Sequence, residues 1–575
     1  GRAVTPRAQE FRWSDGGLPQ VFDPALAAAA PDTDAVRALY EGLTEYDPKT
    51  LAPVPGVAAR WESSPDARVW TFHLRRDARW SNNDPVTAED FVRSWQRTIE
   101  LGDRAPHARL LTNIEGVAAA VVYPTPSPSP APTPEPTQTP ARDSSRREEP
   151  KKEAKPEAAQ PKPVPFGAEA MDDYTLRVRL QRPDPGFPAL ASHPVFRPVH
   201  KLDSLSTEQS PAPVRPVSNG AFQLTKIGAD GVVLERAKNY WDAESVSLQR
   251  VQFVPAKDAE TALAAYHAGE VDAVTNAGFE PLALKLLTPY RDFRRATFGA
   301  LTYYSFNTSR PPFDDVRVRE ALAIAIDRDR ISQDELGGAT EPARKFLPAQ
   351  MIASEPGETP PAPIERDVER ARALLAEAGY PGGDKFPKIR LLVNRNAQQR
   401  QVAEAVAGMW RSALGIETEI IQKEWAEYEI AFREGDYDVA RRSYVMQAAD
   451  ESASLRGMFE PETPPVIMLT AHGIEQTAQQ KKAEAAKEGD AGDAAKESVA
   501  QPPAESVPAP LPILNEAQAL RELPAMPIYF ASSYALVKPY VVGFDPNLLD
   551  APSLKHVRID TSWQQPKQAG LAWFK

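Results

Sequence analysis

The sequence predicts an α/β protein with two lobes. At 575 residues the chain is too long to fold around a single hydrophobic core. Two strand-helix-strand patterns occur more than a hundred residues apart, and each implies parallel strands joined by a right-handed crossover. Low-complexity sequence interrupts the patterned regions at two places, so the folded elements are spread over several separate stretches of the chain.

The first pattern lies in the middle of the chain. SLQRVQFV at 247–254 is typical of a strand, and DAETALAAYHA at 258–268 of a helix that Gly269 ends. EVDAV at 270–274 predicts the second strand. We expect these three elements to form one β-α-β unit.

The second pattern has the same order. IRLLVN at 389–394 predicts a strand, QQRQVAEAVAGMWRSAL at 398–414 a helix that Gly415 ends, and IETEII at 416–421 another strand. Further along, YDVARRSYV at 437–445 alternates between two faces and predicts one more strand. These elements belong to the second lobe.

Two further segments show the periodicity of amphipathic helices. Residues 314–331 predict one helix with Asp314 or Asp315 as N-cap. Residues 365–382 predict another, closed by Gly379 with Pro381 beyond it. We interpret both as scaffold.

Two segments lack the composition of a folded core. Residues 123–165 begin as a Pro-Thr-Ser tract and continue with mixed charges, and residues 476–512 are rich in alanine, lysine and glutamate before more proline. They account for much of the excess of proline, 58 residues in all. Each is either a solvated loop or a tether for a partner.

Composition excludes several classes of protein. Acidic residues outnumber basic ones, 79 to 67, which argues against nucleic-acid binding. No run of 18 apolar residues predicts a transmembrane helix. The absence of cysteine excludes disulfides, thiolate nucleophiles and cysteine-bound zinc. Because the chain begins at Gly1, we expect a mature exported protein whose signal peptide has been removed.

The sequence shows no catalytic signature. No nucleophile elbow, phosphate-binding loop, dinucleotide fingerprint or HExxH zinc motif occurs, and the seven histidines never fall at metal-ligand spacing. We therefore expect no enzyme, no metal and no cofactor. The aromatic cluster of Trp61, Trp70, Trp80 and Trp95 predicts a subdomain core more than a ligand platform, whereas Trp425 fits either a core or a cleft edge.

Several stretches of the sequence carry a resemblance to a known family. They are LYEGLTEYDPKTLAPVPG and the residues that follow up to position 97, SNGAFQL at 218–224, ERAKNYWD at 235–242, HAGEVDA at 267–273, YYSFNTSRPPFDDVRVREALAIAIDRDRI at 303–331 and ARALLAEAGYP at 371–381. In these stretches the sequence resembles family 5 of the extracellular solute-binding proteins, the oligopeptide-, dipeptide- and nickel-binding components of ABC importers.

The resemblance implies a hinged periplasmic-binding-protein fold with an additional N-terminal subdomain. Lobe I would comprise 1–41, 190–298 and 528–575, the subdomain 42–189, and lobe II 299–527. The lobes would close around a ligand, and a peptide would bind as an added strand.

The same resemblance implies a set of ligand-binding residues. In the oligopeptide-binding branch the pattern D-V-A-R-x-G-W-x-x-D lines the pocket, and Asp438 to Arg441 match its start. Beyond this match the sequence departs from the pattern, and two further positions correspond to pocket residues. The candidate ligand-binding residues are Arg441, Ser443, Tyr444, Val445, Gln447, Trp425 and His107.

Gln447 stands where the pattern has an aspartate that pairs with the ligand's ammonium group. A neutral amide compensates a desolvated ammonium less well than a carboxylate does. We therefore expect a free peptide amino terminus to bind less well, and a neutral, blocked or anionic ligand near Arg441 to be favoured.

Two functions follow as hypotheses. The first is an extracytoplasmic binding protein that delivers a peptide-like or other small solute to an ABC permease. The alternative is a degenerate binding protein serving as an accessory or scaffold subunit of a respiratory, photosynthetic or secretory membrane complex, which the altered pocket strand and the two insertions motivate. Binding of small ligands would distinguish the first from the second.

Overall fold

The computed structural model describes residues 8–119, 164–201, 215–351, 362–460, 466–468, 513 and 515–564. Both predicted insertions, 123–165 and 476–512, lie outside these residues except for positions 164 and 165. Within the described part, no helix is long and apolar enough to cross a membrane.

One sheet of eleven strands runs through most of the molecule. Its order is β16-β15-β17-β13-β19-β12-β1-β11-β10-β9, and β14 pairs with β19 beside this path. The strands are β1 (Glu10–Asp15), β9 (Phe222–Gly228), β10 (Gly231–Arg236), β11 (Arg250–Phe253), β12 (Ala273–Thr275), β13 (Phe293–Phe306), β14 (Thr340–Pro342), β15 (Ile389–Asn394), β16 (Thr418–Lys423), β17 (Val439–Val445) and β19 (Ala525–Val537).

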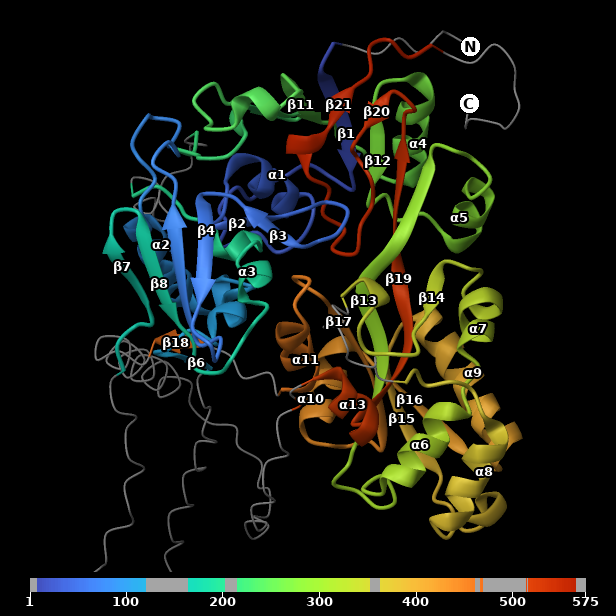
Figure 1. The fold of residues 1–575 in the computed structure, drawn as a ribbon. Helices are drawn as coiled ribbons and strands as arrows, with labels where there is room; N and C mark the ends of the chain where they lie inside the picture. Colours follow the sequence, from blue (N-terminus) through green and yellow to red (C-terminus); the bar gives the residue numbers. More distant parts are fainter. Residues whose placement is uncertain are drawn as a thin grey trace, which may run out of the picture.

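The long strands β13 and β19 connect the two halves of this sheet. They run side by side along the length of the molecule (Figure 1), paired antiparallel on both sides of a register break between Thr297 and Leu301. Gly299 lies in the break, where its N–H donates to the Leu548 carbonyl and its carbonyl accepts from the Met446 N–H. The break is therefore where the ladder between the two strands is weakest.

Both predicted β-α-β units are confirmed. In the first, α4 (Ala259–Ala268) joins β11 to β12, and β1 lies between these strands and parallel to both. In the second, α9 (Ala397–Leu414) joins the adjacent parallel strands β15 and β16. Gly269 and Gly415 end the two helices at φ of 70° and 73°, a left-handed conformation that glycine adopts without strain.

The prediction of one helix over 314–331 was wrong. α6 (Val316–Ile324) starts at the predicted cap Asp315, but it stops at Ala325, and a short helix α7 (Arg328–Arg330) begins anew. Asp327 causes the break, because its carboxylate accepts from the Arg330 N–H and caps the second helix. The buried Arg328 then donates to the Pro527 carbonyl.

A separate antiparallel sheet carries Trp61 and Trp70 of the tryptophan cluster, and Trp95 lies on the helix α2 beside it. The strand order of this sheet is β4-β5-β8-β7, and α2 packs against it (Figure 1). Trp70, Trp80 and Trp95 are buried and Trp61 is half-buried, so the predicted subdomain core is confirmed. These elements are β4 (Ala58–Ser63), β5 (Val69–Leu74), β7 (Ala168–Asp172), β8 (Thr175–Arg179) and α2 (Ala88–Glu100).

The remaining elements surround the two sheets. β6 and β18 pair antiparallel, so the segments just before the two predicted insertions meet in space. The other elements are α1 (Asp32–Leu39), α3 (Phe187–Leu190), α5 (Pro281–Leu287), α8 (Val368–Glu377), α10 (Trp425–Arg433), α11 (Glu451–Phe459), α13 (Glu516–Glu522), β2 (Thr44–Tyr46), β3 (Pro53–Pro55), β6 (Val117–Ala119), β18 (Val466–Met468), β20 (Val541–Val542) and β21 (Arg558–Ile559).

Truncating Trp95 should destabilise the protein strongly. Its ring is fully buried and its Nε1–H donates to the Phe196 carbonyl at 2.8 Å. We expect Trp95→Ala to lower the free energy of unfolding by about 3–5 kcal/mol in urea denaturation. Trp425→Ala, at a side chain that is 58% exposed, is the matched control and should change it by less than about 1 kcal/mol. Equal effects of the two variants would contradict this assignment of the core.

Candidate ligand-binding site

The predicted pocket strand is β17, which pairs antiparallel with the long strand β13. The N–H of Asn307 donates to the Asp438 carbonyl, and the N–H of Met446 to the Gly299 carbonyl. Because hydrogen-bonding direction alternates along an antiparallel strand, the even-numbered residues of β17 face β13. The main-chain groups of the odd-numbered residues therefore face the opposite edge.

That opposite edge is only partly covered. β15 pairs with β17 at Val439 and Ala440, and no further pair follows in the described residues. Beyond this pairing, the Arg441 carbonyl and the N–H and C=O groups of Ser443 and Val445 face an edge that lacks a partner strand among the described residues. Ser443 is exposed, and the Val445 side chain is 43% exposed.

Two of the seven predicted residues, Trp425 and Arg441, are brought together by Tyr428. The exposed Trp425 ring stacks on Tyr428 with centroids 5.4 Å apart and an interplanar angle of 18°. The Tyr428 hydroxyl donates to the Arg441 carbonyl. Sequence reasoning missed Tyr428, although its position three residues after Trp425 on a helix is a signal that could have found it.

Gln447 and His107 meet through His193, which sequence reasoning also missed. His193 Nδ1 accepts from the Val195 N–H at 3.1 Å, so the ring proton of the neutral imidazole is on Nε2. Nε2 therefore donates to Gln447 Oε1 at 3.2 Å. The His107 ring packs edge-on against His193, with centroids 4.8 Å apart.

This corner of the site is electrically neutral. Burial is the main reason that the pKa of His193 lies well below its ordinary value, and the neighbouring His107 lowers it further. Burial also lowers the pKa of His107, whose Nε2–H donates to the Ala28 carbonyl at 2.8 Å. Together with the amide of Gln447, the two histidines supply no charge to hold an ammonium group.

Tyr444 lies apart from the other candidates. It is on the face of β17 that packs against α11, and its ring fills the space that a side chain at Gly457 would need. Burial raises the pKa of its hydroxyl to about 12. Its predicted role in ligand binding thus has no neighbouring candidate residue to support it.

A pair of buried carboxyl groups follows Gln447 along the chain. Asp450 caps α11 through the Ala453 N–H at 2.6 Å, and the buried carboxyl group of Asp184 precedes α3. Burial, followed by the charge of Asp184, raises the pKa of Asp450 to about 8. Asp450 is therefore protonated at neutral pH, and Arg456 lies 3.3 Å from Asp184.

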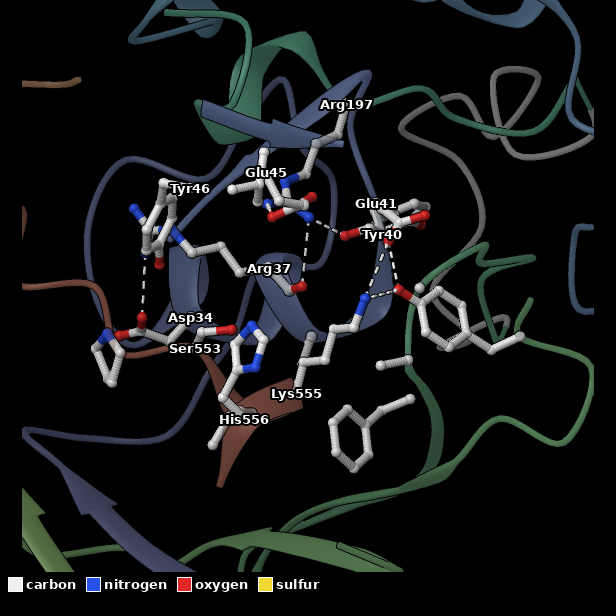
Figure 2. Close-up of a pocket in the computed structure, with 18 of the residues that line it drawn as sticks. Asp34, Arg37, Tyr40, Glu41, Glu45, Tyr46, Arg197, Ser553, Lys555 and His556 are labelled. Atoms are coloured by element: carbon white, nitrogen blue, oxygen red, sulfur yellow. Dashed lines mark hydrogen bonds and ion pairs between the residues drawn. The ribbon is translucent and has the colours of Figure 1, made fainter. Parts of the chain in front are cut away.

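Two cavities lie away from these residues. One, of about 100 Å³, is lined by α1, β2 and the segment around Lys555 (Figure 2). Its charges are already paired, since Arg197 donates to Glu45 at 2.6 Å and Lys555 lies 3.9 Å from Glu41. The other, of about 320 Å³, lies between α5 and the loop at 337–339. Neither is lined by any of the seven candidate residues.

Comparison with known proteins decides the family. The model of the bacterial extracellular solute-binding proteins, family 5, matches residues 52–464. The chain belongs to this family. It is 30% identical to the periplasmic oligopeptide-binding protein OppA of Escherichia coli over 541 residues, which cover 92% of this chain and 89% of that protein.

Two solved structures of the family also resemble this solute-binding protein. The unliganded open form of the murein tripeptide-binding protein MppA superposes with a TM-score of 0.69 at 27% identity, covering 97% of this chain and 99% of that one. OppA of Haemophilus influenzae in complex with the peptide RPPGFSPFR gives 0.55 at 25% identity, covering 96% and 99%. Family membership confirms the two-lobed fold and supports solute binding over the accessory-subunit alternative.

The carboxyl pair in this solute-binding protein should make its stability depend on pH. Between about pH 4 and pH 8 the folded chain keeps the Asp450 proton and the unfolded chain loses it, so the free energy of unfolding falls as pH rises. Asp450→Asn keeps the helix cap and removes this proton. We expect it to reduce the loss between pH 5 and pH 8 by at least about 1 kcal/mol in urea denaturation.

Asp367→Asn is the matched control, because Asp367 is an exposed cap of α8. It should leave the pH dependence of unfolding as it is in the wild type. If Asp450→Asn had the same pH dependence as the wild type, the raised pKa of Asp450 would be disproved.

Proposed function

We propose that the chain binds a peptide-like solute between two closing lobes and delivers it to an ABC-type permease. Lobe I comprises 1–41, 190–298 and 528–575, lobe II comprises 299–527, and the subdomain 42–189 is attached to the first. The register break at Thr297–Leu301 serves as the hinge, because both connecting strands pass through it. The protein acts outside the cytoplasm, after removal of its signal peptide.

The single observation that carries this proposal is the unpaired edge of β17. Ser443 directs its N–H and C=O groups, and Val445 its N–H, to this open edge, as a strand does before a peptide adds to it. Trp425 stands exposed beyond one end of this edge, and the neutral corner of His193 and Gln447 closes the other. The edge thus has the length and chemistry for a short main chain.

The comparisons support the hinge motion. The chain superposes better on an unliganded open form than on a peptide complex of the same family, which is what an open, ligand-free conformation gives. A ligand that contacts both lobes stabilises the closed state by the difference between its affinities for the two states. Closure therefore signals occupancy to the permease.

Truncating Trp425 should weaken ligand binding without unfolding the protein. Its exposed ring offers a flat apolar surface next to the edge of β17. We expect Trp425→Ala to reduce the affinity for a bound peptide about tenfold by isothermal titration calorimetry. Ile430→Ala, at another exposed side chain of the same helix, should leave it unchanged.

Ligand-induced closure can be tested directly. Small-angle X-ray scattering of the purified chain should show a smaller radius of gyration when a bound peptide is added. A protein that binds no member of a library of peptides and other small solutes, and whose scattering never changes, would contradict the proposed function.

A further inference from the structure

The edge of β17 is partly occupied by the protein's own side chains. The Tyr428 hydroxyl donates to the Arg441 carbonyl, and the Gln447 amide donates to the Val445 carbonyl at 2.8 Å. Both carbonyls face the edge that a peptide main chain would join. Two of the three acceptors that β17 offers there, at Arg441, Ser443 and Val445, are therefore already used.

His193 fixes the orientation of the Gln447 amide. Because Val195 donates to His193 Nδ1, Nε2 must donate to Gln447, and the oxygen of the amide must face His193. The amide nitrogen then points toward the Val445 carbonyl. The cap on Val445 is thus set by a buried histidine from the segment after α3, 254 residues earlier in the chain.

Only Ser443 keeps both main-chain groups available. Among the described residues, none bonds to its N–H or C=O along this edge. The Arg441 N–H lies within the parallel pairing of β17 with β15 at Leu392 and Ala440. Beyond that pairing the strand presents two donors, the N–H groups of Ser443 and Val445, and one available acceptor, the Ser443 carbonyl. The guanidinium group of Arg441 adds a positive charge on this strand. Its Nε–H donates to Gln399, and no described residue accepts from its two terminal amino groups.

We propose that this edge selects short ligands that are rich in acceptor oxygens and lack a free amine, such as N-acylated di- and tripeptides. Among the described candidate residues an ammonium group finds no carboxylate, because Gln447 and the two histidines are neutral. A longer main chain must first break the caps on Arg441 and Val445 before its own N–H groups can use those carbonyls. This inference rests on the proposed function and names the class of its ligand.

The test compares matched peptides on the full-length chain by isothermal titration calorimetry. N-acetyl-trialanine should bind the wild type at least about tenfold more tightly than free trialanine, and N-acetyl-pentaalanine should gain nothing from its extra residues. Free trialanine that binds as tightly as the acetylated peptide, or a pentapeptide that binds about tenfold more tightly than the acetylated tripeptide, would overturn the inference.

Variants at Gln447 separate the cap from the charge. Gln447→Ala frees the Val445 carbonyl without adding charge, and should raise the affinity for N-acetyl-pentaalanine about five- to tenfold. Gln447→Asp supplies a carboxylate and should reverse the preference toward free trialanine. Tyr428→Phe, which frees the Arg441 carbonyl, should favour the pentapeptide in the same way as Gln447→Ala.

Gln422→Asp on β16 is the control for charge at a distance and should change no affinity. If Gln447→Asp kept the wild-type preference, the inference would be wrong while the proposed function stood. Failure of the proposed function gives a different result, since neither peptide series would then bind the wild type or any variant, and the inference would fall with it.

Discussion

The pairing of β13 with β19 is the constraint on which the rest of the structure depends. These strands carry the sheet from one half of the molecule to the other, and their ladder is interrupted between Thr297 and Leu301 and shifts in register again between Thr302 and Tyr303. Gly299 keeps the longer break ordered through the Leu548 and Met446 main chains. Because the chain around Met446 is bonded at this break, the candidate site begins next to the hinge that we propose.

The chemistry of the site follows from the direction in which β17 is bonded. Since the even-numbered residues bond to β13, the main-chain groups of the odd-numbered ones face the opposite edge, where we propose that the ligand binds. Side chains then determine which of these groups stay available. Tyr428 and Gln447 each donate a hydrogen bond to one carbonyl of the strand, and no described residue bonds to the main chain of Ser443 along this edge. A register shifted by one residue would present a different set of groups, so the strand pairing determines what the site can bind.

Local sequence patterns predicted those parts of the fold that local physics controls. The two β-α-β units and the glycines that end their helices depend on periodicity and on a left-handed residue, and both are visible in sequence. The prediction of a single helix over 314–331 was wrong because Asp327 is compatible both with the polar face of a continuing helix and with the N-cap of a new helix. Its capping role becomes visible only when the buried Arg328 is seen to bond to Pro527, 199 residues away.

The candidate site was predictable only in part, for the same reason. Family resemblance located β17 and marked Gln447 as unusual, but no local pattern joins it to His193 or joins Asp450 to Asp184. Tertiary contacts between distant segments create both pairs, and both have one effect. At each, a side chain that could carry charge is neutral in the fold: the tautomer of His193 is fixed by the Val195 N–H, and burial raises the pKa of Asp450 to about 8.

Neutrality at this corner has an energetic logic. A buried carboxylate is costly unless a cation repays its desolvation, so a site that keeps one needs a ligand with an ammonium group to be stable when occupied. An amide that is hydrogen-bonded to a neutral imidazole has its hydrogen-bonding partner without any ligand, so the empty site is stable by itself. The same bonds that stabilise the empty site must be replaced by any ligand that takes their place. A ligand that leaves these bonds intact loses no binding energy to breaking them. In the binding mode that we propose, such a ligand is short, because only the main chain of Ser443 lies between the two capped carbonyls.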